Sequence, residues 1–302
     1  MEQASPPPER PDAAPVPVAA GTEPQPAWPP WFAFVGFAAA IVCTSIAVIL
    51  VLAVAGVDPA DDDSSAATVV ATLIQGIFFV GVALVLARSV APPKPWHFGL
   101  RRAPLWRTLG WAALGMLAFY ALTVIYATVV DPQAQQEVTD DLGAGNGKLG
   151  LIAAGAMVIV VAPFVEELFF RGFFYRALRS RYSIAVAALV DGVVFGVIHF
   201  GFDGADGLLI LPPLAFLGVI FCLVYERTKS LWPVIGMHGF NNTIAFAAAT
   251  EEYDGWQVSV VAGPLMLIAC AVLPRLLRDG PPPLPPAPGR VGPEAQLSLP
   301  IQ

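Results

Sequence analysis

The sequence contains few charged residues. Asp, Glu, Lys and Arg make up 13% of its 302 residues, and 56% are hydrophobic, whereas soluble globular domains carry about 25% charged residues. A chain of this length with so little charge cannot cover a water-exposed surface, which excludes an ordinary soluble protein. The composition is that of a polytopic membrane protein.

Cysteine and histidine are also scarce, at three residues each. All three cysteines, Cys43, Cys222 and Cys270, lie in apolar stretches, where a lone thiol behaves as a small hydrophobic group. We therefore expect no disulfide framework. The formal net charge is -7, and we expect no nucleic-acid partner.

Long apolar runs recur along the chain. A bilayer core about 30 Å thick requires roughly 20 apolar residues per crossing helix. Runs that meet this criterion lie near residues 31–57, 67–87, 108–130, 149–170, 184–201, 208–225, 231–249 and 257–274. The sequence therefore predicts an all-α fold, a polytopic membrane helix bundle of about eight transmembrane helices, with the transmembrane domain spanning residues 31–277.

The two ends of the chain differ from this domain. Residues 1–30 and 278–302 are rich in proline and poor in apolar bulk, so both tails are predicted to be disordered. The connections after the second, fourth and sixth runs, and the C-terminal tail, are basic, whereas the other connections are acidic apart from Lys148. By the positive-inside rule both termini are then cytoplasmic, which requires an even number of spans.

A few polar and ionisable side chains interrupt the apolar runs. An ionisable side chain in a span costs roughly 2.5 to 3.5 kcal/mol on insertion scales, so each one suggests a function. The interrupting residues are Glu166, Glu167, Arg171, Asp191, His199, His238, Asn241 and Asn242. Counted from the predicted turn near Arg181, Glu166 and His199 lie at nearly the same depth, roughly 22 and 26 Å from it. They can therefore belong to one site.

Helical spacing separates the two adjacent glutamates. Glu167 and Arg171 are four residues apart and share a helix face, so they can form an ion pair. Glu166 lies about 100° around the helix and points elsewhere. If Arg171 holds Glu167 ionised, Glu166 is free to act as a base. His238 and Asn242 have the same four-residue spacing.

These groups are suited to hydrolysis. Glu166 and His199 can position and deprotonate a water molecule, while His238 and Asn242 can stabilise the oxyanion that forms when the water attacks a carbonyl. A zinc site formed by Glu166, His199 and His238 is an alternative. The sequence lacks the HExxH motif typical of zinc hydrolases, so we expect no cofactor and rank zinc second.

Three motifs carry a family resemblance. They read EELFFR from Glu166 to Arg171, FGVIH from Phe195 to His199, and HGFNN from His238 to Asn242. In this order the sequence resembles the CPBP family of CAAX proteases and bacteriocin-processing enzymes, over roughly residues 149–250. The resemblance implies an intramembrane endopeptidase in which Glu166 is the base, Glu167 and Arg171 support it, His199 is its partner, and His238 and Asn242 form the oxyanion site.

The resemblance also sets expectations for partners and location. It implies membrane lipids around the protein and a peptide, lipidated protein or membrane protein as substrate. We expect an integral protein of a bacterial cell membrane. Three alternatives stay open from the residues alone: interhelical hydrogen bonds with only a structural role, a non-catalytic immunity or binding protein, and a proton-relaying transporter, although the chain shows no repeated halves.

Overall fold

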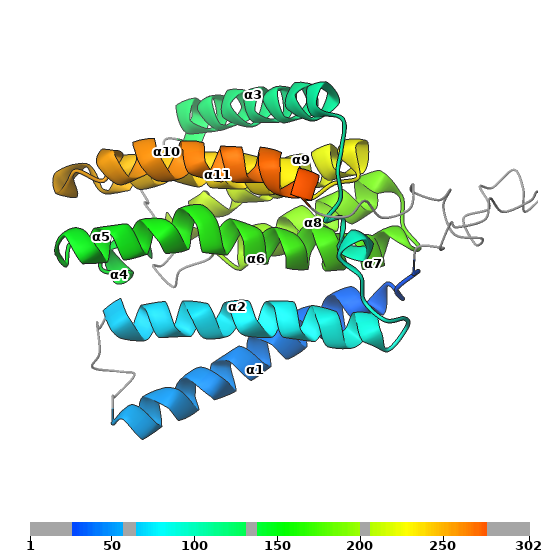
Figure 1. The fold of residues 1–302 in the computed structure, drawn as a ribbon, viewed down its shortest axis with the longest axis horizontal. Coiled ribbons are helices and arrows are strands. Elements are labelled where there is room, and N and C mark those ends of the chain that lie inside the picture. The colour runs from blue at the N-terminus through cyan, green and yellow to red at the C-terminus, as the bar shows by residue number, and fades with distance from the viewer. Residues whose placement is uncertain (1–25, 57–64, 131–137, 200–205, 277–302) are drawn as a thin grey trace, which may run out of the picture.

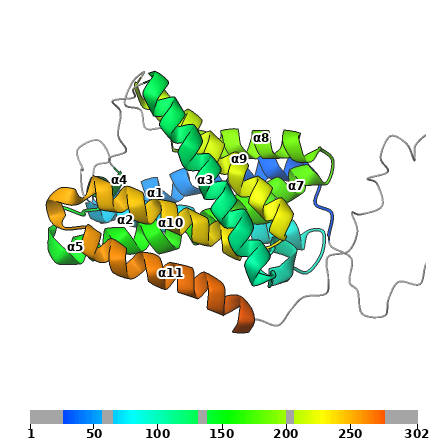
Figure 2. The ribbon, with the colours of Figure 1, turned by 90° about the horizontal axis from the view of Figure 1, so that it is seen from above.

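The computed structural model describes residues 26–56, 65–130, 138–199 and 206–276 (Figure 1). Within these ranges every regular element is a helix, which confirms the predicted all-α fold. Most of the predicted tails, and the acidic residues near 58–63, 131–137 and 203, lie outside the described residues. The long helices run roughly side by side as a bundle (Figures 1 and 2).

A helix occupies each of the eight predicted apolar runs. The helices are α1 (Trp31–Ala55), α2 (Ser65–Arg88), α3 (Leu105–Val130), α4 (Val138–Asp141), α5 (Gly147–Ala156), α6 (Ala162–Phe169), α7 (Tyr175–Arg179), α8 (Ile184–Val197), α9 (Leu211–Thr228), α10 (Trp232–Ala249) and α11 (Trp256–Leu276). Short 3-10 turns lie at Pro95–Phe98 (η1), Asp206–Ile210 (η4) and Glu251–Tyr253 (η5).

Six helical segments of the described chain are long and apolar enough to cross a membrane: α1, α2, α3, the continuous segment Gly147–Arg179, Leu208–Thr228 and α11. The other two predicted spans correspond to α8 and α10, and each fails this criterion for a different reason. Helix α8 has 14 residues, or about 21 Å, which is shorter than the hydrocarbon core. Helix α10 has 18 residues, but His238, Asn241 and Asn242 reduce its mean hydropathy.

The fourth predicted span is one helix with two wide turns. A π-helical turn, η2 (Met157–Val161), joins α5 to α6, and a second, η3 (Phe170–Phe174), joins α6 to α7. Pro163 follows the first wide turn. A proline inside a regular helix has no N–H to donate, and its ring clashes with the carbonyl four residues back. The wide turn accommodates both. Wide turns of this kind often accompany functional sites, and Glu166 and Glu167 lie between these two.

Helices α8 and α9 pack very closely because glycines face each other. A Cβ atom on Gly218 would lie 2.7 Å from the Cα atom of Gly192, and a Cβ atom on Gly192 would lie 2.6 Å from the carbonyl oxygen of Ala215. Gly192 and Gly196 form a GxxxG spacing, which allows helix backbones to approach in membranes. On the same stretch of α9, the Gly218 carbonyl accepts a hydrogen bond from Arg171 of η3.

Phenylalanine forms much of the core beside the candidate site. Phe169, Phe170, Phe173 and Phe174 are fully buried, whereas Phe164 is 37% exposed. Trp28 lies in a stretch that the sequence predicts to be disordered, yet it is buried against Phe173, with ring centroids 5.3 Å apart. The core therefore begins a few residues before α1.

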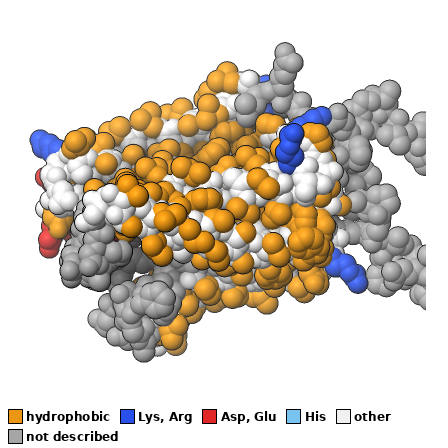
Figure 3. Space-filling view, turned by 90° about the horizontal axis from the view of Figure 1, so that it is seen from below, with side chains coloured by type: hydrophobic (Ala, Val, Ile, Leu, Met, Phe, Trp, Pro, Cys, Tyr) orange, Lys and Arg blue, Asp and Glu red, His pale blue; other side chains and the backbone are white. Residues whose placement is uncertain are grey.

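Charged residues gather at the two ends of the bundle. Hydrophobic side chains cover the middle of the face in Figure 3, and charged groups lie at either end. The end formed by the start of α3 and the ends of α2, α7, α9 and α11 carries most of the Lys and Arg, including Arg88, Arg102 and Arg275. The opposite end carries the acids of α4 and η5. This distribution is that of an integral membrane protein.

Candidate active site

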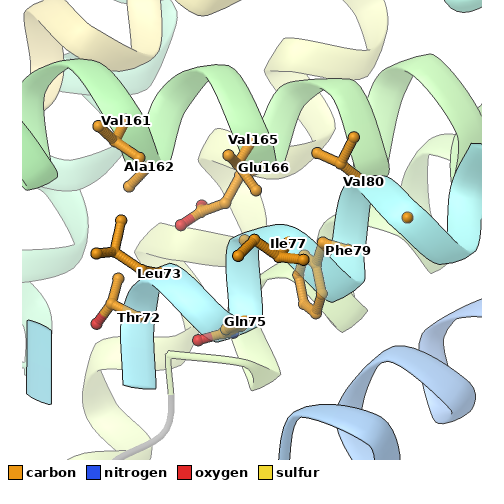
Figure 4. Close-up of a pocket in the computed structure, with 12 residues that line it drawn as sticks. Thr72, Leu73, Gln75, Ile77, Phe79, Val80, Val161, Ala162, Val165 and Glu166 are labelled. Atoms are coloured by element: carbon orange, nitrogen blue, oxygen red, sulfur yellow. The ribbon is translucent and has the colours of Figure 1, made fainter. Parts of the chain in front are cut away.

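Glu166 and Glu167 point in different directions, as their helical spacing predicts. The side chain of Glu167 is completely buried, whereas that of Glu166 is 18% exposed. Glu166 lines a cavity of about 450 Å³ between α2 and α6. Figure 4 shows its carboxylate extending from α6 towards Thr72 and Leu73 of α2. Only the first glutamate is therefore accessible to a reactant.

Two histidines converge on Glu166. Its Oε2 atom lies 3.8 Å from Nε2 of His199 and 3.9 Å from Nε2 of His238. The three residues come from α6, the turn after α8, and α10, and the equal depth expected for Glu166 and His199 agrees with this contact. The separations exceed a hydrogen bond, and this Oε2 atom has no hydrogen-bond partner in the protein. A water molecule is the natural bridge across such distances.

The end of α8 fixes the ring of His199. Helix α8 ends at Val197, two residues before His199, rather than near residue 201 as predicted. The backbone N–H of His199 donates to the Gly196 carbonyl and not to the Phe195 carbonyl. The Phe195 carbonyl is therefore one of the unpaired carbonyls at the helix end and can accept from the imidazole ring of His199. Nδ1 of His199 lies 2.8 Å from that oxygen. Because a carbonyl only accepts, Nδ1 carries the hydrogen and Nε2 faces Glu166.

Glu167 fixes His238 in the same way. Its Oε1 atom accepts from Nδ1 of His238 at 2.9 Å and from Nη1 of Arg171 at 2.9 Å, which is the ion pair expected from the sequence. Because the Glu167 carboxylate can only accept, Nδ1 of His238 carries the hydrogen, and Nε2 again points towards Glu166. A carboxylate bonded to Nδ1–H holds a histidine ring in one tautomer and orientation, as in the Ser-His-Asp triad.

Arg171 holds this arrangement together. Its side chain is completely buried, and Nη2 donates to the Gly218 carbonyl at 3.0 Å. The guanidinium carbon lies 4.4 Å from the ring centroid of Phe195 and 5.1 Å from that of Phe221. A planar guanidinium can make several directed bonds and stack on rings at once, which a lysine cannot do.

Asp191 is the residue whose role the sequence left open. It is fully buried on α8, and its Oδ1 atom lies 3.4 Å from Nε of Arg171, a distance of ion pairing without hydrogen-bond alignment. The same oxygen accepts from the thiol of Cys222 at 3.1 Å. Asp191 therefore forms an ion pair across helices with Arg171. Cys222 donates a hydrogen bond to it, which its apolar surroundings in the sequence did not predict.

Asn242 lies at the wide turn that precedes Pro163. In η2 the amide of Ala162 donates to the carbonyl five residues back, Met157. In this register the next carbonyl, that of Val158, would pair with residue 163, which is proline and has no N–H. The side-chain amide of Asn242 donates to Val158 at 2.8 Å and fills this gap. One of its two amide hydrogens is thus used structurally, and the second is available for the oxyanion role.

The candidate zinc ligands do not form a metal-binding group as they are placed. Zinc bonds to nitrogen and oxygen are about 2.0–2.2 Å, so tetrahedral ligand atoms lie roughly 3.3 Å apart. The distances from Glu166 to the two histidines, 3.8 and 3.9 Å, are longer. Across the described parts of the chain, no three His, Cys, Asp or Glu side chains are arranged to hold a metal ion.

The segment that carries these residues matches a known family. Residues 148–244 match the family described as type II CAAX prenyl endopeptidase Rce1-like. This segment is similar to that family. The resemblance to CAAX proteases seen in the three motifs is confirmed over these residues, which include all six residues assigned to the site: Glu166, Glu167, Arg171, His199, His238 and Asn242.

Three bacterial proteins resemble parts of the chain, and one of them is named as a membrane peptidase. The chain is 30% identical over 129 residues to "Putative membrane peptidase YdiL" of Bacillus subtilis, which is 39% of this chain and 50% of that protein. It is 25% identical over 155 residues to YyaK of Bacillus subtilis, 49% of each chain, and 28% identical over 113 residues to YxdF of Lactococcus lactis, 37% of this chain and 58% of YxdF. The chain thus spans about half the length of these relatives. No solved structure matches it.

Proposed function

We propose that the Rce1-like segment is an intramembrane endopeptidase that hydrolyses a peptide bond with a water molecule activated by Glu166. The observation that carries this proposal is the convergence of two imidazole Nε2 atoms on one unpaired carboxylate oxygen, 3.8 and 3.9 Å away, beside a cavity. The Rce1-like family, and the relative named as a membrane peptidase, support the same class of reaction.

The proposed first step is attack by water. Glu166 removes a proton from the water while His199, whose Nε2 has a free lone pair in the neutral ring, helps to orient it. The water oxygen bonds to the scissile carbonyl carbon, and the carbonyl oxygen becomes an oxyanion. The C–N bond then breaks, and Glu166 returns the proton to the leaving amine.

The proposed oxyanion site comprises His238 and Asn242. Nδ1 of His238 is bonded to Glu167, so its Nε2 carries a hydrogen only when the ring is an imidazolium. An imidazolium in a site shielded from water stabilises a developing oxyanion strongly. The second amide hydrogen of Asn242 completes the proposed site.

The cavity beside Glu166 suggests the class of substrate. Most of its lining is apolar, including Ile77, Phe79 and Val80 from α2 and Val161 and Val165 from the helix of Glu166. We propose a membrane-bound or lipidated peptide, since the cavity lies within the bundle between two spanning helices. The family name makes a prenylated peptide the first substrate to try. We also propose a bacterial cell membrane and cytoplasmic termini, from the charge distribution and the bacterial relatives.

Peptide cleavage by the reconstituted protein tests this function. Prenylated and unprenylated forms of one quenched fluorescent peptide are incubated with wild-type, Glu166→Gln and Glu252→Gln vesicles. Glu252, on the exposed η5 turn, is the matched control for amidation of a glutamate. We expect cleavage by the wild type and the control only. If Glu166→Gln cleaves at the control's rate, the proposed base is wrong, and if a chelator stops cleavage and zinc restores it, the metal alternative replaces this one.

A further inference from the structure

A second cavity lies apart from Glu166. It has a volume of about 530 Å³ and shares no lining residue with the first cavity. Leu109, Ala112 and Met116 of α3 line one side, Leu267 and Ala271 of α11 line the other, and α10 lies between the two helices (Figure 2). Cavities of 300–1,000 Å³ with mostly apolar walls are typical ligand sites.

The length of this cavity corresponds to one leaflet of a bilayer. Its lining on α3 runs from Leu105 to Met116, which is about 17 Å along the helix. Half of a hydrocarbon core about 30 Å thick is about 15 Å. The lining begins at the basic end of the bundle, so the groove extends from one membrane surface towards the midplane.

Two arginines lie at the mouth of the groove. Arg102 donates from Nε to the Pro274 carbonyl at 2.9 Å and from Nη2 to the Arg275 carbonyl at 2.5 Å, which ties the start of α3 to the end of α11. Arg102 and Arg275 both line the cavity, and its described lining includes no acidic residue. A groove with apolar walls and a doubly positive mouth is complementary to a molecule with one hydrocarbon chain and an anionic head.

We propose that this groove binds an anionic phospholipid from the surrounding bilayer. One acyl chain lies between α3 and α11 over α10, and the phosphate lies at Arg102 and Arg275. Guanidinium groups suit this role because their planar fork matches phosphate oxygens. Basic pockets between membrane helices bind anionic head groups in this way. The site does not depend on the proposed hydrolysis.

Lipid retention by the full-length purified protein tests the charge requirement. The protein in detergent is mixed with equal amounts of phosphatidylglycerol and phosphatidylcholine of identical chains, and bound lipid is counted by native mass spectrometry. We expect the wild type to retain phosphatidylglycerol preferentially, and Arg275→Gln to reduce that preference about fivefold, the effect of one surface charge on an anionic lipid. The control is Arg88→Gln at the end of α2, outside the groove.

A second pair of variants tests the hydrocarbon part without changing charge. Ala113 lines the groove and is exposed, whereas Ala118 is exposed on the same helix but does not line it. We expect Ala113→Trp to reduce retention of both lipids and Ala118→Trp to leave retention unchanged. Equal retention of the two lipids by the wild type, an unchanged preference in Arg275→Gln, or equal binding by the two tryptophan variants would overturn the proposal.

Discussion

Arg171 is expected to be far more important for stability than Asp191, although the two residues are ion-pair partners. Glu167, Arg171 and Asp191 carry a charge of -1 when ionised, and all three are fully buried. Arg171→Met leaves two buried carboxylates without their cation and also removes a bond to the Gly218 carbonyl. Removing one partner of a buried ion pair costs about 3–5 kcal/mol, and we expect a value at the upper end of this range.

Asp191→Asn should cost much less. Arg171 stays paired with Glu167, and the three side chains at positions 167, 171 and 191 become neutral in sum. The asparagine keeps an oxygen that accepts from the Cys222 thiol. The new amide N–H would take the place of Oδ2, which has no hydrogen-bond partner, so the cost is that of one unpaired buried donor, about 1–3 kcal/mol. Unfolding of both variants by dodecyl sulfate in the same mixed micelles measures the two free energies. If Asp191→Asn destabilises as much as Arg171→Met, the reasoning about charge balance is refuted.

Three further results are expected. Asn242→Leu should destabilise the protein by about 1–3 kcal/mol in the same unfolding assay, because the Val158 carbonyl loses its donor, and an unchanged stability would contradict the role given to Asn242. Gly192→Val should prevent folding, seen as aggregation in size-exclusion chromatography, because its side chain would collide with the Ala215 carbonyl and α9, and a monodisperse variant would disprove that packing. Activity should survive chelation, because Glu166 is proposed to activate the water without a metal; a loss that zinc reverses would refute this.

The sequence predicted the features that depend on composition and helical period. Apolar runs located a helix at eight places, and six of these lie in segments long and apolar enough to cross a bilayer. The four-residue spacing of Glu167 and Arg171 predicted their ion pair, and equal depth predicted that Glu166 and His199 meet. Each of these follows from one helix, or from two helices joined by a short turn.

The features that escaped prediction depend on contacts between separate helices. Asp191 on α8 pairs with Arg171 on η3, and no spacing along the sequence links these two helices. The close packing of α8 on α9 also depends on separate helices, and the spacing of Gly192 and Gly196 was its available signal. The wide turn before Pro163 changes which carbonyl is unpaired, so the bond of Asn242 could not be derived from regular helix geometry. The length of α10 was clear, but the polar residues of the site make it less apolar than an ordinary span.

The central claim is that Glu166 is the base and that Glu167 only holds His238 and Arg171 in place. One paired measurement tests it. Turnover of a cleaved peptide and the free energy of unfolding are determined for Glu166→Gln and Glu167→Gln beside the wild type. We predict that Glu166→Gln loses about 10²–10⁴ in turnover, the usual contribution of a general base. Its stability should stay near that of the wild type, because the side chain is 18% exposed and the new amide N–H can face the cavity. Glu167→Gln should lose stability and a smaller part of its turnover, about 10–100-fold. Substantial turnover by Glu166→Gln, with loss confined to Glu167→Gln, would contradict the account.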